Sequence, residues 1–360
     1  MRIVSVAART VRWPLPGHGA ARGRNERATM LVELGGDGGA IGLGEAAPLP
    51  GMSIDTLDGA EDAVTALAAR VPFEVTDRGS AFAVARAVAA RAPAARFAIE
   101  TALLDALARA HGTSVAVVLR ARAADPWNAV VSTRVPLATV VDDAEAARRA
   151  LAAGIRCLKI KVLAGDDLSR VAAIAEAAPE ARLRIDANRS WPRAEVAARL
   201  AALARWPIDY VEEPCGDAHW LAAESLPCKI ALDESLATIA PDQLRTALHG
   251  PGLGALVLKP TLLGGFSAVL ELVALTRHTR VAAIVSHGLE GPIGTAACAE
   301  LALAVGGDGP AGLAAHPALA AWQLAVPQLA ADRVHPAELP GLGFDLNLVA
   351  LVRACFGAHR

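Results

Sequence analysis

Five charged residues recur through the middle of the chain at almost constant spacing. They stand 25, 26, 21 and 26 residues apart, each at the end of a short apolar run: Lys161, Asp186, Glu212, Asp233 and Lys259. Alanine-rich stretches with helical periodicity separate the runs. A strand and its return helix take about this many residues, so we expect successive β/α units whose strand ends meet at one face of a barrel. Three acids and two lysines at that face predict an enzyme.

The three acids predict a site for a hard metal ion. Asp186, Glu212 and Asp233 end three consecutive runs, and Mg²⁺ takes oxygen ligands while leaving positions for water or substrate. The alternative for any one acid is an ion pair with a lysine at a strand end. No thiol or imidazole shares this register, which argues against zinc. We expect Mg²⁺, with Mn²⁺ able to substitute, and a small-molecule carboxylate as substrate.

The lysines predict proton transfer. Lys159 and Lys161 are two residues apart and therefore point to the same side of one strand. A lysine is a useful base only when its pKa falls towards neutrality, and partial burial beside another cation, here Lys159, lowers it. Lys161 would then remove a metal-acidified α-proton, with Lys259 on the opposite side of the substrate. The resulting enediolate can lose a β-leaving group, be reprotonated or close a ring. The alternative for the paired lysines alone is a solvated strand end.

Composition narrows the class of protein. The chain has 360 residues, 54% of them apolar, and a formal charge of −2, so no basic field indicates nucleic acid or an anionic membrane as partner. Five cysteines without C-x-x-C spacing indicate reduced thiols. No apolar run is long enough for a signal peptide or a bilayer span. We expect a cytoplasmic protein, whose oligomeric state the sequence does not determine.

The pattern along the chain predicts three parts. Residues 1–120 are expected to form an α+β unit, with antiparallel strands at 3–12, 29–34 and 41–46 and helices at 57–70, 80–91 and 94–111. The β/α alternation runs through 121–317. It has strand one at 129–135, a helix at 142–153 stopped by Gly154, strand seven at 281–285 with a helix at 291–305, and a short eighth strand at 312–315. Residues 318–360 are expected to return to the first unit.

Five motifs in order resemble the enolase superfamily, muconate-lactonising subgroup: K-I-K, R-I-D-A-N, V-E-E-P, L-D-E-S and L-K-P. The resemblance covers nearly the whole chain. It implies a modified TIM barrel, (β/α)7β, under an N-terminal α+β capping domain, and the lysine-base, Mg²⁺-assisted chemistry established for that superfamily. By this resemblance Lys161 is the catalytic base and Glu212 the metal ligand of its pair. The residues that would support the site are Glu213, Glu234, Asn188 and Arg184.

Two of these supporting residues have other interpretations. Asn188 would either orient a metal ligand or cap the turn that follows it. Arg184 points to the same side as Asp186, and its alternative is a buried ion pair.

Finer motifs resemble the o-succinylbenzoate synthase family. They are the segments at 44–51, 186–191, 212–215, 233–236, 259–264 and 286–294. The resemblance implies Mg²⁺-dependent syn-dehydration of 2-succinyl-6-hydroxy-2,4-cyclohexadiene-1-carboxylate to o-succinylbenzoate, a step of menaquinone biosynthesis. Lys161 would act as base and then as acid, and Lys259 would stabilise the dienediolate by cation–π attraction.

Two loops and one turn are candidates for substrate contact. The segment 17–27, rich in glycine and arginine, and the segment 49–53 would close over the substrate, with Arg24 near its carboxylates. An ordinary solvated loop is the alternative. Ser286, Gly288 and Glu290 lie at the strand end that would meet the succinyl tail. His287 departs from the serine-rich pattern of that family. One interpretation is that its side chain faces solvent.

Other activities fit the same charges. An N-succinylamino acid racemase would use Lys161 and Lys259 as opposed bases. A dipeptide epimerase would need an acid pair near strand eight, where only Asp308 stands. For muconate cycloisomerase the motifs of the first unit fit less well. A non-catalytic binding barrel is disfavoured because all five key charges are present.

Overall fold

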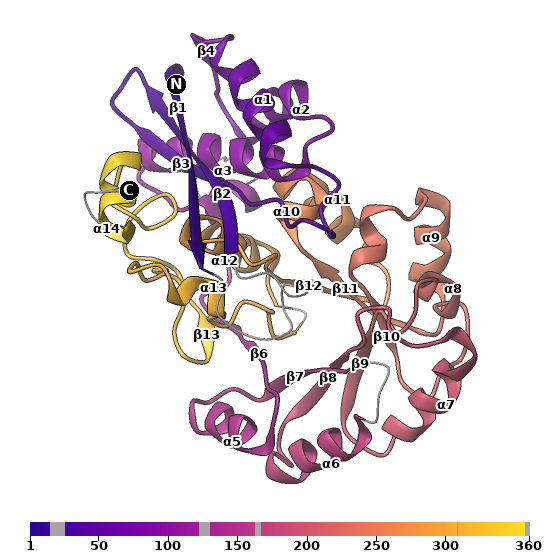
Figure 1. Ribbon diagram of the computed structural model, residues 1–360. Helices are drawn as coiled ribbons and strands as arrows, with labels where there is room; N and C mark the ends of the chain where they lie inside the picture. Colours follow the sequence, from indigo (N-terminus) through magenta and orange to yellow (C-terminus); the bar gives the residue numbers. More distant parts are fainter. Residues whose placement is uncertain (15–25, 122–129, 163–166, 308, 357–360) are drawn as a thin grey trace.

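The computed structural model describes residues 1–14, 26–121, 130–162, 167–307 and 309–356 (Figure 1). An antiparallel sheet with its helices forms the upper unit, drawn from indigo to purple. A parallel sheet with helices on its outer side forms the lower unit, drawn from magenta to orange. Among the described residues, no helix is both long and apolar enough to cross a bilayer.

The upper unit is the capping domain. Its sheet has the order β3-β2-β1-β4, all antiparallel, which confirms the expected meander. The strands are β1 (Arg2–Pro14), β2 (Glu26–Gly36), β3 (Ile41–Ala46) and β4 (Phe73–Glu74). The helices are α1 (Leu57–Ala68), α2 (Arg78–Val88), α3 (Pro93–Ala110) and α4 (Val115–Arg120). Side chains cap the orphan backbone donors at the first turns of α1 and α2, Thr56 for α1 and Asp77 for α2.

Seven parallel strands form the lower unit, in the order β12-β11-β10-β9-β8-β7-β6. They are β6 (Ala138–Val140), β7 (Cys157–Lys161), β8 (Arg182–Asp186), β9 (Ile208–Glu212), β10 (Ile230–Leu232), β11 (Leu253–Leu258) and β12 (Ala282–Val285). Parallel bridges from Leu137 to Ala311 and from Ser286 to Gly312 join the two sheet edges. The enolase-like fold class is thus confirmed, with all five key charges at the strand ends where the sequence placed them.

Helices follow most of these strands and cover the outer face of the sheet (Figure 1). They are α5 (Ala144–Ala152), α6 (Leu168–Ala177), α7 (Arg193–Leu203), α8 (Ala218–Leu221), α9 (Pro241–His249), α10 (Pro260–Leu263), α11 (Gly265–Thr276) and α12 (Pro292–Val305), together with the 3-10 helix η1 (Glu234–Ala237). Gly154 lies just after the C-terminal end of α5 and has a φ of 91°, as its position after the alanine-rich run predicts.

Two expected strands are corrected. Residues 130–134 are not a strand, and the Val130 side chain is 89% exposed. The first barrel strand is β6, because Pro136 has no backbone N–H and pairing with the barrel begins at Ala138, whose N–H donates to Ala311. The expected eighth strand is reduced to bridges at 311 and 312, earlier than the predicted 312–315.

The C-terminal segment contacts both units. It contains α13 (Pro317–Ala320), β13 (Arg333–Val334) and α14 (Leu348–Phe356). β13 pairs with β5 (Val135–Pro136) beside the barrel, and α14 lies against β2 of the capping domain. The domain boundaries at residues 120 and 317 stay predictions.

Buried acids join the capping domain to the rest of the chain. Glu45 accepts from the backbone N–H groups of Gly291 and Gly294 at the start of α12, at 2.6 and 2.8 Å. Glu100 accepts from Ser267 in α11, and Asp105 accepts from Leu342. Each carboxylate satisfies donors that would otherwise be buried without a partner. The cap is therefore attached to the barrel by specific polar contacts as well as by apolar packing.

Strand β3 approaches the backbone of α3 so closely that only glycine fits at Gly42 and Gly44. A Cβ on Gly44 would lie 2.0 Å from the carbonyl oxygen of Ala98, and one on Gly42 would lie 1.9 Å from that of Ala102. Backbone atoms cannot move aside as the end of a flexible side chain can. The close approach places the following loop over the barrel mouth.

We predict that Gly44→Ala lowers the free energy of unfolding by about 3 kcal/mol, because the added methyl group must push β3 away from α3. Urea denaturation measures this loss. Gly38→Ala is the matched control, since a Cβ there meets nothing within 4 Å. Equal stability of the two variants would contradict the packing argument.

Candidate active site

A cavity of about 580 Å³ lies at the C-terminal ends of the barrel strands. Barrel residues form most of its wall, and the cap contributes Leu49, Pro50 and Met52. The chain contains only four lysines, and three of them, Lys159, Lys161 and Lys259, line this one cavity. Such a concentration of one residue type in a closed pocket indicates chemistry rather than solubility.

Strand register explains how the charges meet. Lys161, Asp186 and Glu212 are paired directly across β7, β8 and β9, so they form one row at the strand ends. The row beneath, one pleat away on the same face, contains Lys159, Arg184 and Tyr210. The upper row therefore presents acids and a base to the cavity, and the lower row forms its floor.

Two ammonium groups lie among three buried carboxylates. Asp186, Glu212 and Asp233 are at most 4% exposed. The Nζ of Lys159 lies 2.9 Å from Asp186 Oδ2 and 2.8 Å from Glu212 Oε1, while Lys259 forms an ion pair with Asp233. Buried anions need such cationic partners, because taking an unpaired charge out of water is costly.

The carboxylates also act on one another. Burial raises the pKa of Asp233, Lys259 opposes the rise, and the neighbouring Glu212 adds to it. For Glu212 burial also raises the pKa, but the ammonium groups of Lys159 and Lys259 reverse this and leave it below its ordinary value. Each of two buried carboxylates in contact disfavours the charge of the other, and additional positive charge beside them would relieve this repulsion.

Lys161 differs from the other two lysines of the cavity. Burial lowers its pKa, Asp186 opposes this, and the ammonium groups of Lys159 and Lys259 lower it further. Among the described residues, no carboxylate lies within ion-pair distance of its Nζ. In contrast, the pKa of Lys259 is raised, because Asp233 and Glu212 outweigh the effect of burial. Of the three lysines of the cavity, Lys161 is thus the one whose pKa is lowered.

The acid cluster suits a divalent metal ion. Asp186, Glu212 and Asp233 offer carboxylate oxygens, the ligands that Mg²⁺ and Mn²⁺ prefer, and they already surround positive charge. Within the described part of the chain, no three acidic, histidine or cysteine side chains stand at metal-ligand geometry, and ammonium groups lie between the acids. Binding of an ion by these residues would therefore require that Lys159 and Lys259 move aside.

Two residues that follow the strands hold the acids in place. The backbone N–H of Asn188 donates to Asp186 Oδ1 at 3.0 Å, and its side chain donates to Glu234 at 3.3 Å. Glu213 is fully buried and accepts from the backbone N–H groups of Asp233 and Ser235, both at 2.8 Å. Asn188 and Glu213 have positive φ angles of 42°, a conformation costly for residues other than glycine and frequent at functional sites.

The cavity floor is built around one arginine. Arg184 donates to the carbonyl of Pro310 at 2.7 Å and to Asp209 at 3.4 Å, and its guanidinium lies 4.9 Å from the centre of the Tyr210 ring. The sequence allowed two interpretations of Arg184, a buried ion pair and a contact with the site. Both are present. Glu234 also lines the cavity, and its Oε2 atom has no partner among the described residues.

The turn after β12 contributes only part of the expected substrate contacts. Ser286 and Gly288 line the cavity, and Ser286 Oγ donates to the carbonyl of Gly312 at 3.1 Å. Glu290 is not among the residues that line it, because its buried carboxylate turns back to accept from the N–H of Gly288 at 2.7 Å. Burial raises the pKa of Glu290 to about 7, and Glu45 adds to the effect.

The arginine-rich loop is mostly outside the described residues, and Arg24 with it. Arg27, at its end, is only 2% exposed and donates to the carbonyls of Ala47, Pro48, Gly288 and Leu289. One guanidinium thus joins the cap loop to the turn after β12. Sequence reasoning did not identify this role, because an arginine in a loop rich in arginine has no pattern to distinguish it.

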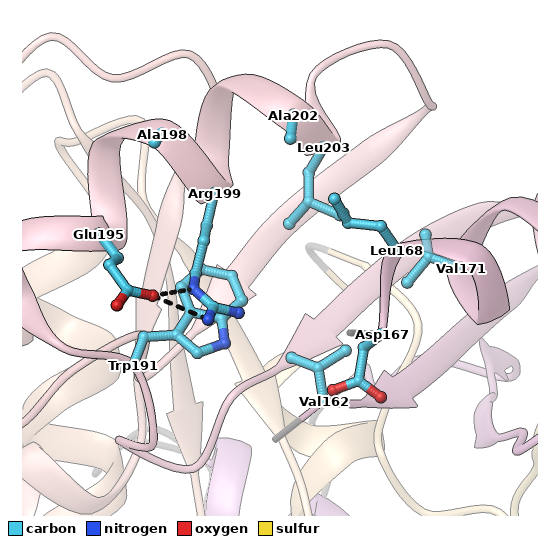
Figure 2. Close-up of a pocket in the computed structure, with 10 residues that line it drawn as sticks. All are labelled: Val162, Asp167, Leu168, Val171, Trp191, Glu195, Ala198, Arg199, Ala202 and Leu203. Atoms are coloured by element: carbon cyan, nitrogen blue, oxygen red, sulfur yellow. Dashed lines mark hydrogen bonds and ion pairs between the residues drawn. The ribbon is translucent and has the colours of Figure 1, made fainter. Parts of the chain in front are cut away.

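A second cavity, of about 540 Å³, lies between α6 and α7 (Figure 2). Its walls are mainly apolar, with Leu168 and Leu203 facing each other across it. Arg199 lies over Trp191 and bonds to Glu195 at 2.8 Å. The carboxylates among its described lining residues, Asp167 and Glu195, are each paired with an arginine. The described part of its lining therefore lacks the group of converging charges that marks the first cavity.

Tyr210 and His316 are among the lining residues that the predicted site did not include. Tyr210 precedes Glu212 by two residues, so the alternation of a strand would have placed it on the same face. His316 follows the short eighth segment and stacks on His287, with ring centroids 4.1 Å apart. His287 lines the cavity, which corrects the interpretation that it faces solvent. Nothing local in the sequence relates these two histidines, since they meet only when the barrel closes.

Family models match both parts of the chain. Residues 142–350 match the family described as Enolase C-terminal domain-like. Residues 3–119 match the family described as Mandelate racemase / muconate lactonizing enzyme, N-terminal domain.

Individual relatives carry different names. An o-succinylbenzoate synthase of Desulfotalea psychrophila is 29% identical, over 78% of this chain and 85% of its own. An aromatic dipeptide epimerase of Herpetosiphon aurantiacus is also 29% identical, over 88% of this chain and 92% of its own. The solved structure of a dipeptide epimerase from Methylococcus capsulatus, complexed with Mg and the dipeptide L-Arg-D-Lys, is 25% identical. It covers 95% of this chain and 99% of its own with a TM-score of 0.77.

We predict that Asp186→Asn weakens Mg²⁺ binding at least about tenfold, because the change removes a charged oxygen ligand from the cluster. Isothermal titration calorimetry measures the affinity. Asp242→Asn is the control, since the Asp242 side chain is 94% exposed and lies outside the cavity. Unchanged affinity in Asp186→Asn would remove this residue from the ligand set.

Proposed function

The chain belongs to the enolase superfamily, within its mandelate racemase / muconate lactonizing enzyme group, and from that premise we propose that it is an o-succinylbenzoate synthase. The proposed reaction is the syn-dehydration of 2-succinyl-6-hydroxy-2,4-cyclohexadiene-1-carboxylate. Metal-dependent chemistry on a small carboxylate is common to the group. Because the two named relatives are equally identical to this chain, the choice between activities depends on the site.

The observation that carries the proposal is the difference between the two flanking lysines. A lyase that removes a proton and expels hydroxide from the same face needs one lysine that exchanges protons and tolerates a second that stays charged. Lys161, with its lowered pKa and no carboxylate partner among the described residues, suits the first task. Lys259, paired with Asp233, suits the second. A racemase needs both lysines to exchange protons in turn.

The residues would act in two steps. When bound by Asp186, Glu212 and Asp233, a divalent ion would draw charge from the substrate carboxylate and so acidify the α-proton. Neutral Lys161 takes that proton at Nζ, and the electrons of the broken C–H bond move towards the carboxylate. The resulting ammonium of Lys161 then gives the proton to the departing hydroxyl group, so that water leaves and the ring becomes aromatic. Lys259 stays cationic and stabilises the negative charge on the ring.

Racemisation of N-succinylamino acids is the second candidate, because Lys161 and Lys259 both line the cavity. Epimerisation of dipeptides is also compatible with the relatives. Asp308, the one acid that the sequence offered near strand eight, lies outside the described residues.

The test mixes purified protein, Mg²⁺ and the cyclohexadiene substrate and follows the loss of diene absorbance, with EDTA as the control. Rapid loss that EDTA abolishes is the expected result. If the protein binds Mg²⁺ but leaves the diene intact, the synthase assignment is wrong. Exchange of the α-proton for deuterium in N-succinylamino acids would then support the racemase.

We predict that Lys161→Ala reduces turnover by about a thousandfold or more while folding and Mg²⁺ affinity stay close to wild type, because only the proton-transfer group is lost. Steady-state kinetics, thermal unfolding and calorimetry give the three quantities. Lys229→Ala is the matched control, since Lys229 is the one lysine of the chain that does not line the cavity. An unfolded Lys161→Ala variant would indicate a structural role instead.

The reaction should also depend on pH in one direction. Lys161 must be neutral to accept a proton, and its pKa in the folded protein lies below the ordinary value of 10.5. The kcat/KM should therefore rise with pH as Lys161 loses its proton. The midpoint of the rise should lie below 10.5, and the rate should level off above that midpoint. A pH–rate profile measures the midpoint, and its absence from the Lys161→Arg profile would assign it. A rate that falls over the same range would contradict the role of base.

A further inference from the structure

Two stacked histidines form part of the cavity wall four strands away from Asp186. His287 follows β12, and His316 comes after the short eighth segment and directly precedes α13. Their ring centroids are 4.1 Å apart, with 27° between the planes. Both residues line the same cavity as the catalytic lysines, and His316 is only 8% exposed. Because the barrel has eight strand positions, His287 lies opposite Asp186 across the cavity.

The hydrogen bonds of the pair are incomplete. His287 Nδ1 accepts from the backbone N–H of Leu289 at 3.1 Å, so its remaining nitrogen, Nε2, carries the proton of the neutral ring and is a donor. Neither Nδ1 nor Nε2 of His316 has a partner among the described residues, although both are buried. A buried polar atom without a partner costs free energy that a bound ligand can recover.

The charges that act on the rings are positive. Burial, then His316, then the nearby lysines keep the pKa of His287 well below its ordinary value. Burial, and then Arg27, lower the pKa of His316 to about 3. Both rings are therefore neutral at neutral pH, with N–H donors in a positive field. Such a wall favours a carbonyl or carboxylate oxygen and disfavours an ammonium group.

We propose that His287 and His316, here called the histidine wall, bind an oxygen acceptor of the substrate. This acceptor lies at the far end of the molecule, away from the carboxylate beside which the proton is removed. The ligand class is a carboxylic acid with a second arm that ends in a ketone or carboxylate. This inference rests on the proposed function, where that arm is the succinyl group. It also makes the histidine wall the feature that selects against substrates with a cationic far end.

The test compares equilibrium binding of two probes in the presence of Mg²⁺, o-succinylbenzoate and benzoate, which lacks the second arm. Wild-type protein should bind o-succinylbenzoate more tightly. His316→Phe keeps an aromatic ring against His287 but removes both nitrogens. It should weaken o-succinylbenzoate binding by about tenfold or more and leave benzoate binding unchanged. His316→Gln, which restores a donor, should recover part of the loss.

The control is His278→Phe, because His278 is exposed on the outer surface and does not line the cavity. Thermal unfolding of each variant verifies the fold. Equal loss for both probes, no loss for either, or wild-type protein that does not prefer o-succinylbenzoate would overturn the inference. If His316→Phe loses affinity for o-succinylbenzoate alone but the wild-type protein does not dehydrate the diene, the role of the histidine wall stands and the synthase assignment is wrong. If the wild-type protein dehydrates the diene but His316→Phe shows no selective loss of o-succinylbenzoate affinity, the synthase assignment stands and the role of the histidine wall is wrong.

Discussion

Burial of three carboxylates at one layer of strand ends is the constraint on which the site depends. Asp186, Glu212 and Asp233 are almost inaccessible to water, and anions in such a place must be neutralised by cations or by protons. Lys159 and Lys259 supply the cations in the structure. Their engagement leaves Lys161 as the one lysine of the cavity without an acid partner among the described residues. The same electrostatics thus gives the three lysines different roles: Lys159 supports the acids, Lys259 stays charged, and Lys161 is the proposed base.

The rest of the fold keeps that layer in place and covers it. The layer beneath it holds Lys159, Arg184 and Tyr210, and the residues that alternate with them, such as Leu158 and Ile185, are apolar and buried. The cap closes the opposite side with Leu49, Pro50 and Met52, and Arg27 joins that loop to the turn after β12. Buried acids such as Glu45 and Glu100 accept backbone donors from barrel helices. A cap attached by satisfied polar groups is oriented more specifically than one held by apolar contact alone.

Much of this arrangement could be predicted from the sequence because it obeys local rules. A charge at the end of an apolar run marks a strand end, and the alternation of a strand places Lys159 beneath Lys161. Where prediction failed, the deciding contact was distant in sequence for strand one and for the two histidines, and local for Glu290. Strand one moved to β6 because Pro136 cannot donate and Ala138 pairs with Ala311. Glu290 turned away from the cavity to bond its own turn, and the stacking of His287 on His316 depends on barrel closure.

The claim at the centre of this account is that the three carboxylates form one cation site. Anomalous diffraction from crystals soaked in Mn²⁺ tests it directly, because the ion is located without reference to activity. We predict a single strong peak within coordination distance of an oxygen from each of Asp186, Glu212 and Asp233, with the Lys159 ammonium displaced from between them. A cluster that stays closed around its lysines, with no peak or with one elsewhere, would contradict it.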